Sequence, residues 1–249
     1  LARMAITIRL ATVLPRSRRR LCASVLICVE KPRMSTPRSR LHGLYVITDR
    51  ALAAGRPLPE LVAAALEGGA RVVQYRDKTA DHARRRDEAR ALAALCRDAG
   101  ALLIVNDDVE LALAAQADGV HLGRDDAGIA AARSRLGPDR LIGVSCYDRF
   151  DRAVAAQQAG GDYVAFGSFF PSPTKPAAVR AGLALLERGR RELDLPLVAI
   201  GGITPENAGA LVAAGADMLA VIHAVFAAAD VRAAAAAFAP LFAPEEPPA

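Results

Sequence analysis

Three polar side chains with alternating spacing follow one apolar segment of this sequence. Gln74, Arg76 and Lys78 point to the same side wherever the chain is extended, because successive side chains of a strand face opposite ways. Two cations and an amide on one side could grip an anion together with a polar ring. The alternative is a solvated strand end, and this segment alone leaves both interpretations open.

Carboxylates follow the next two apolar segments. Asn106, Asp107 and Asp108 are consecutive, and Asp125 and Asp126 come after the following segment. Mg²⁺ binds one or two carboxylates together with phosphate oxygens and water, so carboxylates beside a basic anion site predict a magnesium position. Helix N-caps use the same residue types, and Asp107 or Asp108 could equally serve as one.

Hydroxyl groups and glycines supply further candidates for binding phosphate. Ser145 ends one apolar segment, where its hydroxyl could donate to a phosphate or a ring. Gly201 and Gly202 precede a predicted helix, and backbone N–H groups can approach an oxyanion there. After the last segment, Ile222 and His223 could complete the same site, or His223 could simply begin a helix. A Pro-rich loop combines two hydroxyls with an ammonium group, in Ser172, Thr174 and Lys175.

A paired catalytic nucleophile is missing from these segments. No strand end offers a Ser–His–Asp set, and Cys146 would face away from Ser145 in an extended strand. His121 lies inside a predicted strand and is interpreted as a core residue or as a support for the site. Two anion sites and a magnesium site without a nucleophile indicate electrostatic catalysis on phosphorylated substrates.

Eight short apolar segments precede these polar groups, as expected for strands that are buried on both faces. The predicted strands are 44–48, 71–75, 101–105, 119–122, 141–145, 162–166, 196–200 and 217–222. Helical patterns separate them, for example at 58–66 and 81–98. Eight strand–helix units predict a single (β/α)8 TIM barrel, whose site lies at the carboxyl ends of the strands. An open doubly wound sheet is the alternative.

The positive net charge is concentrated at the N-terminus. Residues 1–40 hold ten basic residues and one acidic residue, a net charge of +9, and the other residues comprise 22 basic and 26 acidic ones, a net charge of −4. The predicted barrel is therefore mildly acidic, which argues against a nucleic-acid partner. No apolar run approaches the roughly 20 residues that span a bilayer, so no membrane partner is expected.

Three parts are predicted along the chain: a basic extension at 1–40, a catalytic barrel at 41–239 and a Pro-rich tail at 240–249. We interpret the extension as disordered or as a start assigned too early, with Met34 as the initiator. A secretory signal and a functional basic arm are the alternatives, but Glu30, Lys31 and Pro32 stand where a signal cleavage site should be.

The four cysteines lack zinc or redox spacing, so we expect a reducing, cytoplasmic location. The sequence allows a homo-oligomer without indicating one.

Between residues 44 and 226 the sequence resembles the thiamine-phosphate synthase family. The resemblance rests on LYVITD, VVQYRDK, LIVNDD, ADGVHLG, IGVS, GDYVAFGSFFPSPTK, VAIGGITPEN and AGADMLAVI, which occur in the family's order. It implies a pyrimidine diphosphate site made by Gln74, Arg76, Lys78, Asn106, Ser145 and Lys175. It implies a thiazole phosphate site made by Ser172, Thr174, Gly202, Ile222 and His223. It also implies Mg²⁺ ligands at Asp107 and Asp126.

The resemblance further implies a dissociative reaction that gives thiamine phosphate and diphosphate. Ser172 and His223 depart from the family pattern, which often has Thr and Ser there, and this puts the side-chain role of His223 in doubt. A thiazole tautomerase of the same fold is one alternative, but it uses a histidine where Tyr147 stands. A non-catalytic barrel that senses thiamine precursors is another, although such a sensor could lose ligands that this sequence keeps.

Overall fold

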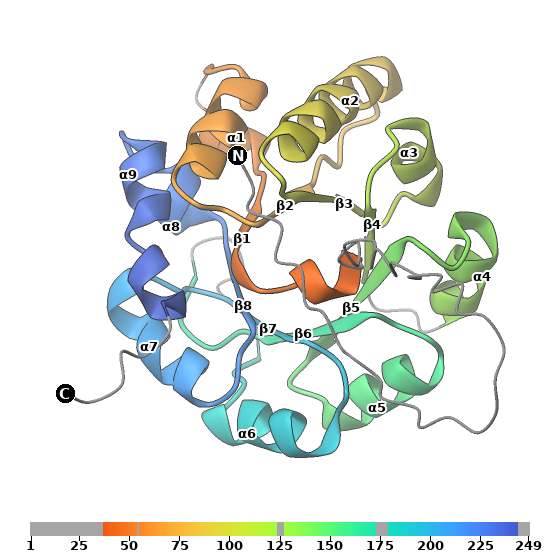
Figure 1. The fold of residues 1–249 in the computed structure, drawn as a ribbon, viewed down its shortest axis with the longest axis vertical. Helices are drawn as coiled ribbons and strands as arrows, with labels where there is room; N and C mark the ends of the chain where they lie inside the picture. Colours follow the sequence, from red (N-terminus) through yellow and green to blue (C-terminus); the bar gives the residue numbers. More distant parts are fainter. Residues whose placement is uncertain (1–36, 54, 124–126, 173–178, 244–249) are drawn as a thin grey trace, which may run out of the picture. The chain divides into compact units, whose positions relative to one another are not determined.

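Eight parallel strands close into a barrel in the computed structural model, which describes residues 37–53, 55–123, 127–172 and 179–243 (Figure 1). Strand order follows chain order, and β1 pairs with β8 to close the ring. The strands are β1 Gly43–Ile47, β2 Val72–Tyr75, β3 Leu102–Asn106, β4 Gly119–Leu122, β5 Leu141–Tyr147, β6 Tyr163–Gly167, β7 Leu197–Ile200 and β8 Met218–Val221. The predicted (β/α)8 barrel is therefore confirmed, and the open sheet is excluded.

All eight predicted strands are present, and their ends differ from prediction by at most two residues. β4 has the predicted bounds, whereas β5 continues two residues further, to Tyr147. The pairing of β5 with β6 shifts register between Ser145 and Tyr147. Such a bulge at a barrel rim re-aims the side chains beside it, which a pattern of alternating residues does not reveal.

An aspartate stands directly before each of β4, β6 and β8. Asp118, Asp162 and Asp217 each accept a 2.8 Å hydrogen bond from a backbone N–H near the start of the preceding strand. Burial would leave these N–H groups without water, so the carboxylates satisfy them at the bottom of the barrel. Two of the predicted strands included such an aspartate, and for this reason they began one residue too early.

Helices surround the barrel and cover the outer face of every strand (Figure 1). They are α1 Leu58–Glu67, α2 His82–Asp98, α3 Val109–Ala114, α4 Ala127–Leu136, α5 Phe150–Gln158, α6 Leu183–Glu192, α7 Pro205–Ala213, α8 His223–Phe226 and α9 Val231–Ala236. Short 3₁₀ turns are η1 Pro37–Arg40, η2 Arg50–Ala53 and η3 Ala239–Phe242. Asp81 caps α2 through the N–H of Arg84. The two predicted helices, 58–66 and 81–98, are thus confirmed to within a residue.

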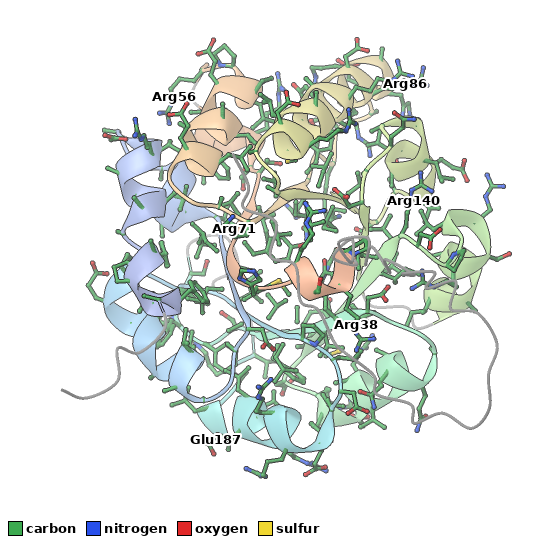
Figure 2. The ribbon with its side chains drawn as sticks, in the orientation of Figure 1. Arg38, Arg56, Arg71, Arg86, Arg140 and Glu187 are labelled. Carbon is green, nitrogen blue, oxygen red and sulfur yellow. The ribbon has the colours of Figure 1, made fainter. Side chains whose placement is uncertain are left out.

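The barrel has two layers of apolar packing. The inner layer fills the space inside the strands, and the outer layer lies between strands and helices. Because alternate strand residues enter the two layers, strand burial is continuous, as in β1 and β6. Charged side chains occupy the outside of the helical ring, where Figure 2 shows Arg86 on α2 and Glu187 on α6 pointing away from the barrel.

The ends of the chain extend beyond the described residues. Most of the predicted extension at 1–40 and of the predicted tail at 240–249 falls at 1–36 and 244–249, so these domain boundaries stay predictions. The turn η1 is described, and Arg40 there donates hydrogen bonds to the backbone oxygens of Gly100 and Ala101. Among the described residues, no helix has the length and apolar character needed to cross a membrane.

Candidate active site

A cavity of about 1190 Å³ opens at the carboxyl ends of the strands. Polar groups from β2, β3 and β5 lie on its wall together with the loops that follow β6, β7 and β8. Eight of the predicted site residues line it, namely Gln74, Arg76, Asn106, Ser145, Ser172, Gly202, Ile222 and His223. Barrel closure thus collects side chains that are far apart in sequence into one cavity, as the sequence predicted.

A second depression of about 560 Å³ holds Lys78 and Asp107. Asn106 lines both spaces, so the two adjoin. The predicted alternation of Gln74, Arg76 and Lys78 holds for the first two, which line the larger cavity. Because β2 ends at Tyr75, the chain is no longer a strand at Lys78, and Lys78 lines the neighbouring depression instead.

Three predicted site residues lie outside the described residues. They are Asp126, Thr174 and Lys175. The structure gives no position for the second predicted Mg²⁺ ligand or for these two members of the Pro-rich loop, so their roles stay predictions. Ser172, at the described start of that loop, is half-buried and lines the cavity.

The two consecutive aspartates after β3 have different partners. Asp108 caps α3 by accepting from the N–H of Leu111 at 2.9 Å, and it pairs with Arg85 at 2.9 Å. Asp107 instead accepts from Asn106 Nδ2 at 2.7 Å and from the N–H of Gly123 at 3.1 Å. The ambiguity between helix cap and ligand is therefore resolved in favour of Asp108 as the cap.

Asp107 fits the role of a magnesium ligand. Its backbone is left-handed, with φ of 59°, and it forms no ion pair with any described residue. A carboxylate held at a strand end without a cationic partner offers the hard oxygen donors that Mg²⁺ prefers. The described residues hold no group of three His, Cys, Asp or Glu side chains that converges on a metal position. A magnesium ion at Asp107 would therefore draw its other ligands from water or from the oxygens of a bound phosphorylated molecule.

An ion-pair network holds the loop after β2. Arg84 on α2 binds Asp77 at 2.8 Å, donates to Thr79 Oγ1 at 2.6 Å and also pairs with Glu88. Burial raises the pKa of Asp77, but hydrogen bonds from Thr79 and Arg84 outweigh it and lower that pKa to about 2. Tyr75 donates to Glu88 at 2.7 Å, which joins the strand to the network. The loop that carries Arg76 and Lys78 is thus anchored to α2, a connection that the sequence pattern did not reveal.

The loop after β7 approaches the chain after β6 very closely. Gly201 and Gly202 have φ of 107° and 62°, and a Cβ at Gly202 would lie 2.2 Å from the backbone oxygen of Pro171. Asn207 on α7 fixes the loop from the other side, since it accepts from the N–H of Thr204 and donates to the oxygen of Gly202. Only glycine fits this position, and the backbone that results faces the cavity at the start of α7, where N–H groups suit an anion.

Ser145 is connected to a buried imidazole. His121 Nε2 lies 2.9 Å from Ser145 Oγ, and His121 Nδ1 lies 3.2 Å from the hydroxyl of Tyr163. Burial raises the pKa of Tyr163 well above its ordinary value, so that hydroxyl keeps its proton. His121 was predicted to be a core residue or a support for the site. Its contact with Ser145 favours the interpretation as a support for the site. Cys146 is buried in the outer layer, away from Ser145, as predicted.

The fold and cavity define a (β/α)8 barrel whose ligand site lies at the carboxyl ends of its strands. The family model described as thiamine monophosphate synthase matches residues 44–225. The chain belongs to this family, so it is an enzyme and a transferase. The resemblance predicted from the sequence is thereby confirmed.

Curated and structural relatives agree with this assignment. A thiamine-phosphate synthase of Thiobacillus denitrificans is 60% identical over 203 residues, which make up 82% of this chain and 96% of that protein. One of Aromatoleum aromaticum is 57% identical over 206 residues, 83% of this chain and 99% of that protein. The structure of a thiamine phosphate pyrophosphorylase from Pyrococcus furiosus is 40% identical with a TM-score of 0.73, and the match covers 82% of this chain and 96% of that one.

Proposed function

We propose that this enzyme joins 4-amino-2-methyl-5-pyrimidinylmethyl diphosphate to 4-methyl-5-(2-phosphoethyl)thiazole in a Mg²⁺-dependent reaction. The products are thiamine phosphate and diphosphate. The observation that supports the proposal is one cavity that is lined by members of both predicted binding sets. Arg76, Asn106 and Ser145 lie on the side formed by β2, β3 and β5, and Gly202 and His223 follow β7 and β8. Two phosphorylated substrates could therefore lie next to each other in one cavity.

The proposed reaction breaks one carbon–oxygen bond and forms one carbon–nitrogen bond. The electron pair of the broken bond leaves with the diphosphate, and the aminopyrimidine ring stabilises the methylene cation that remains. The thiazole nitrogen then donates its lone pair to that carbon. No protein nucleophile takes part, which agrees with the lack of a Ser–His–Asp set in the sequence.

Charge on the departing diphosphate is the main feature that the protein must stabilise. Arg76 and Asn106 line the cavity where the diphosphate would lie, and Lys78 lines the depression beside it. We assign Lys175 to the same set from the family pattern. Mg²⁺, when bound at Asp107 and Asp126, supplies positive charge to the diphosphate oxygens. Gln74 would hold the pyrimidine ring at the floor of the cavity.

The thiazole phosphate is assigned to the opposite side. The backbone of Gly202 at the start of α7 and the backbone at Ile222 and His223 would accept the phosphate, with hydroxyls of Ser172 and Thr174 as further donors. The imidazole of His223 is exposed, so the proposal relies on its backbone rather than its ring. We also expect a cytoplasmic location, since the cysteine spacing gives no disulfide framework.

Purified protein with both substrates tests the proposal. With Mg²⁺ present, thiamine phosphate and diphosphate should appear together, and EDTA should stop both. Addition of Mg²⁺ in excess over EDTA should restore them. A folded protein that forms neither product in Mg²⁺ would contradict the proposal. Conversion of a thiazole tautomer without any coupling would favour the tautomerase, and binding without turnover would favour a sensor.

A further inference from the structure

A continuous line of hydrogen bonds runs through the inside of the barrel from Gln74 to Ser145. Gln74 Nε2 donates to the hydroxyl of Tyr45 at 2.7 Å, and that hydroxyl lies 3.0 Å from the hydroxyl of Tyr163. Tyr163 continues to His121 Nδ1 at 3.2 Å, and His121 Nε2 continues to Ser145 at 2.9 Å. These five residues, from β2, β1, β6, β4 and β5, are called the relay below.

The interior members of the relay are shielded from solvent. Tyr45 and Tyr163 are 1% and 0% exposed, Gln74 is 3% exposed and His121 is 8% exposed. Buried polar groups need partners, and each of these side chains forms at least one hydrogen bond within the relay. Burial also raises the pKa of both tyrosines, so each hydroxyl carries one hydrogen to donate.

Only the bond from Gln74 to Tyr45 has a fixed donor, because either tyrosine hydroxyl can donate to the other and the roles of the His121 nitrogens depend on the tautomer. One consistent arrangement starts from this donor. In it, Tyr45 accepts from Gln74 and donates to Tyr163, and Tyr163 donates to an unprotonated His121 Nδ1. A neutral imidazole of this kind carries its hydrogen on Nε2, which donates to Ser145. Ser145 then accepts within the relay, and its hydroxyl hydrogen is available to the cavity.

A glycine on β5 provides the space for the ring of Tyr163. Gly143 on β5 stands opposite Tyr163 on β6, and a Cβ at Gly143 would lie 2.0 Å from Tyr163 Cζ. The phenol ring of Tyr163 therefore occupies the space of the missing side chain, with its ring 6.2 Å from that of Tyr45 and 5.6 Å from that of His121. A Phe or Leu would fill an apolar barrel interior without a buried hydroxyl, so packing alone does not explain Tyr163.

We propose that Tyr45, Tyr163 and His121 are positioning residues that hold His121 in its Nε2–H tautomer and thereby make Ser145 a hydrogen-bond donor toward the substrate. This inference deepens the proposed function and rests on it for the identity of the substrate. The relay selects a substrate that presents an acceptor atom, a ring nitrogen or a phosphate oxygen, to Ser145. A substrate with a hydrogen at that place would meet two donors and be rejected.

The tautomer of His121 can be measured without any substrate. Long-range ¹H–¹⁵N spectra of protein labelled at histidine distinguish a hydrogen on Nε2 from one on Nδ1. The chain has four histidines, and His42, His82 and His223 are exposed, so their signals should average over the two tautomers. The His121→Gln variant assigns the remaining signal. A neutral ring with its hydrogen on Nε2 is expected. A hydrogen on Nδ1 would overturn the proposal, because the unprotonated Nε2 would then accept the hydroxyl hydrogen of Ser145 that the proposal directs to the substrate.

Two tyrosine variants separate the relay from general packing. Tyr163→Phe removes the donor to Nδ1, so the Nδ1–H tautomer of His121 should become populated. Tyr75→Phe is the matched control, because Tyr75 is equally buried but donates to Glu88 outside the relay. The His121 spectrum of this control should match that of the wild type. An unchanged tautomer in Tyr163→Phe would overturn the proposal.

Kinetics then connect the tautomer to substrate recognition. Ser145→Ala should lower kcat/KM about tenfold, as expected for the loss of one hydrogen bond to substrate. Tyr163→Phe should lower kcat/KM by a smaller factor, and the double variant should be no slower than Ser145→Ala, because both changes remove the same donor. If the fold-losses in kcat/KM of the two single variants multiply in the double variant, the two residues act independently and the proposal is contradicted. If the wild type forms no thiamine phosphate, the proposed function fails while the tautomer spectrum still decides the relay.

Discussion

The carboxylate of Asp107 accepts a hydrogen bond from the backbone N–H of Gly123 across 3.1 Å, which ties the end of β3 to the loop after β4. Asn106 Nδ2 holds the second carboxylate oxygen at 2.7 Å. The two hydrogen bonds orient the carboxylate before any ligand is present. Because the family pattern assigns Mg²⁺ ligands to these same two loops, at Asp107 and Asp126, the bond to Gly123 links the two halves of the proposed metal site.

The Asp107→Asn variant should lose Mg²⁺-dependent turnover by about 100-fold or more and keep its fold. Asparagine tolerates the left-handed backbone at φ of 59° and can still accept from Gly123, so the substitution removes the charge and the hydrogen bond from Asn106. Initial rates across a Mg²⁺ titration, with thermal unfolding as a check, measure the effect. Asp108→Asn is the control, since it keeps an N-cap for α3 and should retain the wild-type Mg²⁺ dependence. Normal turnover in Asp107→Asn would remove Asp107 from the metal site.

Loss of the Arg84 guanidinium should weaken binding of the pyrimidine diphosphate. Arg84→Met removes the partner of Asp77 and Thr79, so the loop with Arg76 and Lys78 loses its anchor on α2. We expect KM for this substrate to rise about tenfold, with a smaller change in KM for the thiazole phosphate. Steady-state kinetics with each substrate varied in turn measure the two KM values. Arg86→Met on the same helix is exposed and should behave as the wild type. Equal effects of the two variants would argue against the anchor.

The stability that Asp77 contributes should disappear in acid. Its folded-state pKa is about 2 against 3.8 for an ordinary aspartate, so the unfolded chain binds a proton first as the pH falls. The contribution is therefore complete above about pH 4 and is lost between about pH 4 and pH 2. Urea unfolding should show that the wild type has a larger free energy of unfolding than Asp77→Asn at pH 6, and that this difference becomes smaller below pH 4. A difference that stays constant over this range would exclude the ion pair as its source.

Two glycine substitutions should have opposite effects on stability. Gly143→Ala places a methyl group 2.0 Å from Tyr163 Cζ, and this overpacking should cost about 1 to 3 kcal/mol in the free energy of unfolding. Gly209→Ala lies within α7 with nothing inside 4 Å, so it should stabilise the protein by about 0.5 to 1 kcal/mol. Chemical denaturation measures both. The account of the barrel interior fails if Gly143→Ala is as stable as the wild type.

The fold could be predicted because each strand has its own apolar segment. Residues 119–122, for example, form β4 with the predicted bounds. Strand ends were less predictable where a side chain binds backbone, as Asp162 does, or where a bulge extends β5 to Tyr147. These features depend on the neighbouring strand, and a local pattern carries no information about that neighbour.

Candidate site residues could be predicted where they lie at or just after a strand end, because the barrel brings all eight ends to one face. Gln74, Arg76 and Asn106 were chosen in this way, and they line the cavity. The relay was not found, since Tyr45 and Tyr163 are separated by 118 positions and look like ordinary core aromatics in the sequence. The one signal was Gly143 inside a predicted strand, which marks a close approach by a neighbouring group.

The most direct test of the central claim is a ³¹P NMR time course of one reaction that contains both substrates, Mg²⁺ and the purified protein. The account predicts that the pyrimidine diphosphate signals decline while diphosphate and thiamine phosphate signals rise in equal amounts, and that omission of the thiazole phosphate prevents thiamine phosphate formation. Intact substrate signals after prolonged incubation of the folded protein would contradict the claim that this cavity joins the two substrates.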